Sequence, residues 1–147
     1  MILTTMITLP VQAVQVLPHR NSMCCIDTLV ACDENSATAL VCLNDDFIFI
    51  EGKHLNPAAY IELAAQTAGA MMGFLAQAQG RSPLEGFLVG VQNFTIHHIA
   101  SVNDILTIKV LINSVFEQIT VLEFQIYKDN ILCAEGNIKV YLPNTSQ

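Results

Sequence analysis

The sequence predicts an α+β fold in which an antiparallel β-sheet wraps around one long, buried helix. Residues 57–79 form an apolar run of helical character that carries a single charge, Glu62. Two strand-like segments precede this run, and four segments with alternating apolar and polar residues follow it. A helix that is apolar nearly all round must be buried nearly all round, so the flanking strands are expected to cover it. A chain of 147 residues suits a single domain, residues 1–147, with one core.

The segment ahead of the long helix is expected to hold a short helix and a β-hairpin. The short helix is predicted at residues 11–17, where Pro18 ends it. Residues 24–32 and 36–43 are apolar and rich in β-branched side chains, and the polar residues 33–35 separate them. This pattern is typical of two strands joined by a tight turn.

The long helix has sequence signals at both of its ends. Asn56 is a good N-cap and Pro57 suits the first helical position, while Gly80 and the residues that follow it provide a stop. The run is also long enough for a membrane-spanning helix. However, Glu62, Gln66 and other polar residues would be costly in hydrocarbon, and neither an aromatic belt nor a basic flank accompanies them. We therefore expect the helix to lie inside protein.

Four strands are predicted after the helix, because the apolar period changes there from about 3.6 residues to 2. The first covers residues 87–97, and connections between later strands are expected at residues 113–117 and 127–130. Each of the three later strands has one apolar face: Leu106, Ile108, Val110 and Ile112; then Leu122, Phe124 and Ile126; then Leu132, Ala134, Ile138, Val140 and Leu142. Strands with one apolar and one more polar face fit an antiparallel sheet that is covered on one side.

Composition restricts the partners and the compartment. Charged residues make up 13% of the chain, against roughly 25% in an average soluble domain, so we expect a dimer or higher oligomer that hides part of the surface. The net charge of −7 argues against nucleic acid or an anionic membrane as a partner. The five cysteines lack C-x-x-C spacing, which favours buried, reduced thiols in a cytoplasmic protein over a zinc site. The N-terminus has neither the basic region nor the cleavage site of a secretion signal.

Three segments carry motifs of a known family. Residues 17–20, Leu-Pro-His-Arg, together with Ile26 and Asp27, look like the opening L-P-H-R-x-x-x-x-x-[VI]-D. Residues 61–66, Ile-Glu-Leu-Ala-Ala-Gln, are similar to the helix motif [LI]-E-A-[ML]-A-Q. Residues 88–91 and 102–104 follow the strand F-x-G-[IV] and the turn P-G-D, although Val-Asn replaces P-G. From about residue 11 to 142 the chain thus resembles the (3R)-hydroxyacyl-acyl carrier protein dehydratases of fatty acid synthesis.

The resemblance implies a hot-dog fold, in which the sheets of two protomers usually join edge to edge. It also implies elimination of water from 3-hydroxyacyl thioesters without a cofactor or a metal. Glu62 matches the catalytic carboxylate of the helix motif, and Gly90 matches a backbone N–H donor to the thioester oxygen.

One family motif is shortened in this chain. The family's histidine lies in G-H-F-P-G-x-P-x-x-P-G, whereas residues 52–57 offer only Gly-Lys-His-Leu-Asn-Pro, with His54 as the one histidine. The proline-glycine framework that normally aims the histidine is therefore missing. The short loop looks like a variant branch from gene clusters for aryl polyenes and other polyketide-type pigments, whose members can serve as partners of a fuller dehydratase.

The reaction needs a base for the α-proton, an acid for the departing hydroxyl and donors for the thioester oxygen. His54 is the provisional base, because an imidazole suits that role at neutral pH. Glu62 is the expected acid, because desolvation on an apolar helix favours the protonated carboxyl, although the helix dipole opposes this. Gln66, one turn on, can hold Glu62 through an i, i+4 hydrogen bond and help to bind substrate, but it also suits a polar position in an interface.

The other site residues have structural interpretations as well. Glu62 can be paired with Arg20, with Lys53 or with a backbone cap. His54 can be a solvated loop histidine. Gly90 can serve the close packing of a strand on the helix.

The acyl substrate is expected on acyl carrier protein or coenzyme A. Because acyl carrier protein is acidic, docking requires a local basic patch, for which Arg20, Lys53 and Arg81 are the available side chains. Two other functions stay open: a noncatalytic acyl-binding subunit of a heteromeric dehydratase, and a hot-dog thioesterase whose helix carboxylate directs water. His97 and His98 are expected at the surface or rim, without a metal.

Overall fold

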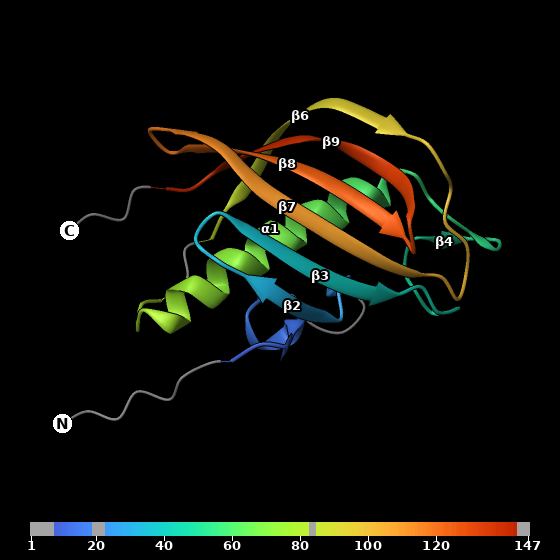
Figure 1. Cartoon of the computed structure of the whole chain (residues 1–147), viewed down its shortest axis with the longest axis horizontal. Helices are drawn as coiled ribbons and strands as arrows, with labels where there is room; N and C mark the ends of the chain where they lie inside the picture. The colour runs from blue at the N-terminus through green and yellow to red at the C-terminus, as the bar shows by residue number, and fades with distance from the viewer. Residues whose placement is uncertain (1–7, 19–22, 83–84, 144–147) are drawn as a thin grey trace.

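The computed structural model of the protein describes residues 8–18, 23–82 and 85–143 (Figure 1). In chain order its elements are β1 (Val11–Gln12), the 3₁₀ helix η1 (Ala13–Gln15), β2 (Thr28–Cys32), β3 (Ser36–Cys42), β4 (Ile50–Glu51), β5 (His54–Leu55), α1 (Ala59–Ala78), β6 (Phe87–Ile96), β7 (Ile105–Phe116), β8 (Ile119–Lys128) and β9 (Ile131–Tyr141). His19 and Arg20 of the opening motif lie outside the described residues.

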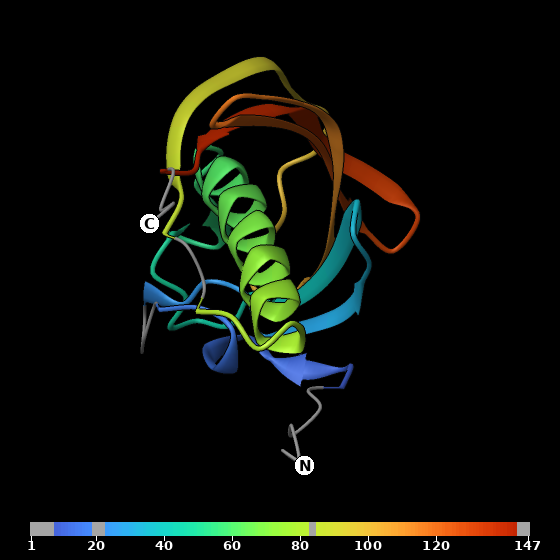
Figure 2. The same cartoon turned by 90° about the vertical axis from the view of Figure 1, so that its left-hand side faces the viewer.

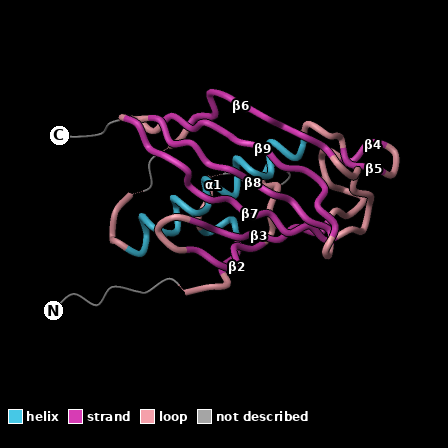
Figure 3. The backbone as a smooth tube through the Cα atoms, turned by 45° about the horizontal axis from the view of Figure 1, so that its top comes forward, coloured by secondary structure: helices cyan, strands magenta, loops and turns pink. Residues whose placement is uncertain are grey.

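Seven strands form one antiparallel sheet in the order β1-β2-β3-β7-β8-β9-β6, and β4 and β5 pair separately. The sheet curls around α1, so that the helix lies inside the curve (Figure 2). Figure 3 shows β4 and β5 together at one end of the sheet. The predicted α+β class, with an antiparallel sheet wrapped around one central helix, is confirmed.

The core lies between α1 and the concave face of the sheet. The inward faces predicted for β7 and β8 are correct, although Ile112 at the end of this face is only partly buried. The other predicted residues are at most 2% exposed: Leu106, Ile108, Val110, Leu122, Phe124 and Ile126. From the helix, Tyr60, Leu63 and Met71 are fully buried against them. Within the described residues, no helix is both long enough and apolar enough to cross a membrane.

The prediction of a short helix at residues 11–17 is wrong for most of that segment. Val11 and Gln12 pair with β2 instead, and only Ala13–Gln15 form a 3₁₀ turn. The segment then lies against the C-terminal half of α1, where a Cβ atom added to Gly73 would overlap the Val16 carbonyl oxygen. The backbone of Val16 can approach the helix this closely because Gly73 has no side chain.

Helix α1 starts two residues later than the sequence predicts. The N-cap is Ala58, without a side-chain cap, so the prediction of Asn56 as N-cap is wrong; Asn56 Oδ1 instead accepts from the Ala58 N–H at 2.9 Å in the turn before the helix. The N–H groups of Ala59 and Tyr60 bond to carbonyls three residues back, so the chain enters the helix through a 3₁₀ turn. At the other end, Gly80 has a φ of +69°, which suits its predicted role as a stop.

The connection predicted at residues 113–117 is wrong, because β7 continues to Phe116. A β-bulge between Ile112 and Ser114 interrupts the alternation of side chains, and pairing with β8 resumes beyond it. The turn falls instead after Phe116, with Glu117 at a φ of +53°.

Three smaller boundaries also differ from the prediction. Residues 24–27 precede β2 rather than belonging to it, and the expected loop at 51–56 contains the β4–β5 pair. Strand β6 ends at Ile96, because the N–H groups of His97 and His98 both bond to the Cys133 carbonyl oxygen.

Candidate active site

The carboxylate of Glu62 lies in the first turn of α1, half-buried, beside the buried amide of Gln66. Gln66 Nε2 donates to Glu62 Oε2 at 2.7 Å, which is the i, i+4 hydrogen bond expected from the sequence. The same nitrogen donates to the Met23 carbonyl oxygen at 2.8 Å, and Gln66 Oε1 accepts from the Cys25 N–H at 2.7 Å. The Gln66 amide therefore orients Glu62 and ties the segment 23–25 to the helix beside it.

Glu62 forms no ion pair with another described residue. The two ion pairs in the described part of the chain are those of His97 with Glu135 and of Lys128 with Asp104. The structural interpretation of Glu62 as the partner of Lys53 is therefore wrong. Its other suggested partner, Arg20, lies outside the described residues.

The Cys25 thiol is close enough to Glu62 to feel its charge, and it is held in its neutral form. Burial raises the pKa of Cys25 to about 11, and the negative charge of Glu62 adds to this effect. A thiol with such a pKa is protonated at neutral pH and is a weak nucleophile. All five cysteines are free, although only Cys25 and Cys133 are buried, so the expectation that most of them are buried is wrong.

His54 lies on β5, and its side chain is exposed. Its Nδ1 is hydrogen-bonded to Ser101 Oγ at 3.1 Å, and the two residues also form an antiparallel β-bridge. No hydrogen bond or ion pair joins His54 to Glu62 in the described part of the chain. Within one protomer, the two predicted catalytic residues are therefore not joined by a hydrogen bond or an ion pair.

Tyr60 is a residue at this end of the molecule whose role the sequence does not predict. Its side chain is fully buried, and its hydroxyl donates to the His98 carbonyl oxygen at 2.8 Å and accepts from the Ala100 N–H at 3.0 Å. Burial is the main reason that the pKa of Tyr60 rises to about 12. The available signal was a tyrosine in an otherwise apolar helix, because a buried phenol needs a hydrogen-bond partner.

Replacing Tyr60 with phenylalanine is expected to lower the free energy of unfolding by about 1–3 kcal/mol, because the buried Ala100 N–H loses its acceptor. The measurement is denaturant unfolding of this variant and of Tyr141→Phe as a control. Tyr141 is 37% exposed in the wild type. Equal stability of the two variants would show that the Tyr60 hydroxyl does not stabilise the loop at residues 98–100.

Gly90 lies on β6 opposite Lys139 of β9. A Cβ atom added to Gly90 would meet the Lys139 side chain at 3.5 Å, an ordinary contact distance, and no atom of the helix. The interpretation that Gly90 permits close packing on the helix is therefore wrong. Its role as a donor to the thioester oxygen stays a prediction.

Of the basic patch expected from Arg20, Lys53 and Arg81, Arg20 lies outside the described residues, and the other two do not form one patch. Lys53 precedes α1 and Arg81 follows it, and the 20 residues of the helix separate them by roughly 30 Å. Arg81 donates to Gln79 at its own end of the helix. His97 and His98 are exposed, as expected, and the described residues contain no cluster of three or more metal-ligating side chains.

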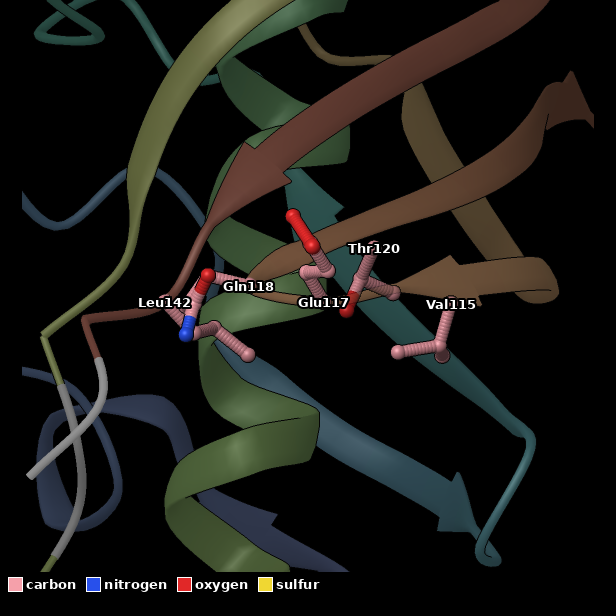
Figure 4. A pocket seen from close by; sticks show the side chains of 5 residues that line it. All are labelled: Val115, Glu117, Gln118, Thr120 and Leu142. Carbon is pink, nitrogen blue, oxygen red and sulfur yellow. The ribbon is translucent and has the colours of Figure 1, made fainter. Parts of the chain in front are cut away.

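A cavity of about 510 Å³ lies at the turn between β7 and β8, lined by Val115, Glu117, Gln118, Thr120 and Leu142 (Figure 4). This turn is at the end of the sheet opposite to β4 and β5 (Figure 1). The cavity therefore does not include Glu62, His54 or Gly90.

A protein-family model described as ApeP-like, ApeP dehydratase, matches residues 11–147. A comparison with curated protein sequences gives no match. Among solved structures, the dehydratase heterocomplex ApeI:P from Xenorhabdus doucetiae is similar, with a TM-score of 0.84, 21% identity, and coverage of 94% of this chain and 93% of that one.

Two hot-dog proteins of other descriptions are also similar. A hypothetical thioesterase with coenzyme A from Streptococcus pneumoniae has a TM-score of 0.65 and 11% identity, covering 81% of this chain and 87% of that one. The PaaI protein of E. coli has a TM-score of 0.60 and 14% identity, covering 77% and 80%. At these identities the similarity establishes the fold, and the hot-dog fold implied by the sequence motifs is confirmed.

Proposed function

The chain belongs to the ApeP-like dehydratase family, and on this premise we propose that it acts in the elimination of water from 3-hydroxyacyl thioesters carried on acyl carrier protein, in fatty acid or polyene biosynthesis in the cytoplasm. The observation that carries the proposal is the carboxyl group of Glu62. It is half-buried on an apolar helix, oriented by Gln66 and without an ionic partner among the described residues.

In the proposed mechanism, Glu62 protonates the departing hydroxyl while an imidazole removes the α-proton. The C–H electron pair forms the new double bond, and the C–O bond breaks to release water. The Gly90 N–H is the proposed donor to the thioester oxygen, which gains negative charge in the transition state. His54 is the proposed base.

We propose that the site is completed by a second hot-dog subunit. The outer edge of β6 has no neighbour among the described residues, and Phe87, Leu88 and Val89 on this strand are 42–56% exposed. An open, apolar strand edge is a surface that another strand can extend. No hydrogen bond or ion pair joins His54 to Glu62 within one protomer, which supports the same proposal, because a second subunit can bring its own imidazole to Glu62.

The heterocomplex ApeI:P gives a specific reason to consider the second candidate function, that of a noncatalytic subunit whose partner provides the histidine. The two functions differ in how they respond to loss of His54. If His54 is the base, His54→Ala is expected to lower hydration of an enoyl thioester by roughly 100-fold or more in the homo-oligomer. If a partner provides the base, activity appears only on mixing with a dehydratase from the same gene cluster, and His54→Ala has no effect.

The assay follows the loss of the conjugated enoyl thioester, with crotonyl-acyl carrier protein and crotonyl-coenzyme A as separate substrates. Glu123→Gln, a change on the exposed face of β8, serves as a control for the handling of variants. The same reactions are monitored with a thiol reagent. Release of one free thiol for each enoyl thioester lost would contradict the dehydratase function and favour the thioesterase.

A further inference from the structure

We propose that Ser101 is a positioning residue for His54, which fixes the imidazole with Nδ1 toward the protein and Nε2 toward the substrate. This inference rests on the proposed role of His54 as the base. The chain lacks the proline-glycine framework that aims the histidine in the family motif, so the orientation of the ring has to come from another part of the fold.

The backbone around His54 is held by the loop that leads into β7. His54 and Ser101 form a β-bridge, the Leu55 N–H donates to the Ala100 carbonyl oxygen at 2.8 Å, and the Val102 N–H donates to the Lys53 carbonyl oxygen at 2.8 Å. These contacts place the Ser101 hydroxyl beside the ring, where Oγ is 3.1 Å from Nδ1.

The backbone of Ser101 and of the residues before it is held by side chains from other parts of the fold. Its N–H donates to Asp104 Oδ2 at 2.8 Å, and Asp104 Oδ1 pairs with Lys128 Nζ at 3.1 Å. Two residues upstream along the loop, the Tyr60 hydroxyl holds the backbone on both sides of residue 99. The hydroxyl of Ser101 therefore sits on a rigid loop rather than on a free surface segment.

The other acceptor close to His54 along the β4–β5 pair is already engaged. Glu51 lies opposite His54 in this pair, and its Oε2 accepts from Asn56 Nδ2 at 2.9 Å. Glu51 makes no hydrogen bond to the ring in the described structure, whereas the Ser101 hydroxyl does.

The proposed direction of the hydrogen bond decides which nitrogen can act, since a serine hydroxyl can either donate to Nδ1 or accept from it. A neutral imidazole has one protonated nitrogen and one with a free lone pair, and the base must offer the lone pair to the substrate. In the proposed tautomer, Nδ1–H donates to Ser101 Oγ, which leaves the lone pair on Nε2. When Nε2 takes the α-proton, the ring becomes a cation, and the same Nδ1–H donates more strongly to the serine oxygen.

The first test reads the tautomer directly and does not depend on activity. Long-range ¹H–¹⁵N correlation spectra of the full chain at alkaline pH distinguish the protonated from the bare ring nitrogen, and His54→Gln assigns the signal. We expect the Nδ1–H form of His54 in the wild type and a shift toward the Nε2–H form in Ser101→Ala. An unchanged tautomer in Ser101→Ala would overturn the proposal.

The second test measures hydration of crotonyl-acyl carrier protein by Ser101→Ala and by Ser101→Thr, which keeps the oxygen. Loss of one such hydrogen bond is expected to lower kcat by roughly 2- to 10-fold with little change in KM, and threonine is expected to restore it. Ser114→Ala, an exposed serine on β7, is the matched control and should behave as the wild type.

The two proposals fail in distinguishable ways. If His54→Ala abolishes activity while Ser101→Ala changes neither kcat nor the tautomer, the positioning role is wrong and the base assignment stands. If His54→Ala retains full activity, the base assignment is wrong, and with it the catalytic relevance of Ser101.

Discussion

Replacing Gly73 with alanine is expected to lower the free energy of unfolding by about 2–3 kcal/mol. The added Cβ would overlap the carbonyl oxygen of Val16 and approach its carbonyl carbon to 3.0 Å. These are backbone atoms, so they cannot rotate away as the end of a side chain can. The substitution therefore forces the segment after η1 to move off α1, where Gln77 also holds it through the Gln15 carbonyl oxygen.

Gly69→Ala is the matched control, because it lies one turn earlier on the same helix. Its Cβ would meet only the Leu17 Cδ2 atom, at 3.2 Å, and a leucine side chain can shift by a few tenths of an ångström. Alanine also gains about 0.5–1 kcal/mol over glycine in a helix interior, so this variant should be close to neutral. Denaturant unfolding compares the two. Equal stabilities would contradict the close packing of residues 13–16 on α1.

The period of the apolar residues predicts the helix and the strands because burial imposes that period. The inward faces of β7 and β8 agree with the prediction wherever the alternation is unbroken. The prediction fails where tertiary contacts override the local pattern. Val11 joins the sheet because it pairs with Leu29. Strand β7 continues past Ile112, but the bulge there places two polar residues in succession, so the alternating pattern that predicts a strand is lost.

The same distinction applies to the site. The Glu62–Gln66 hydrogen bond is predictable, because residues four apart on a helix face each other. The contacts of His54 with Ser101 and of Tyr60 with Ala100 join residues 47 and 40 positions apart, and only the folded sheet brings them together. The separation of Lys53 from Arg81 likewise follows from the helix between them, which the count of charges does not reveal.

Replacing Glu62 with glutamine is expected to lower enoyl thioester hydration by roughly 100- to 10,000-fold, the range typical of removing a general acid. Glutamine has nearly the same shape, and its carbonyl oxygen can still accept from Gln66 Nε2. The fold should therefore persist, with unfolding midpoints close to those of the wild type. Among the described residues the substitution breaks no ion pair, because none of them pairs with Glu62.

The most direct test of the account is the hydration rate of crotonyl-acyl carrier protein by the wild type, Glu62→Gln and Glu123→Gln at equal concentrations of folded protein. The assay is run on the chain alone and again with a dehydratase from the same gene cluster. The account predicts that Glu123→Gln matches the wild type and that Glu62→Gln loses at least 100-fold in the assembly that is active. Full activity of Glu62→Gln in both assemblies would contradict the assignment of Glu62 as the acid, and only the fold would remain established.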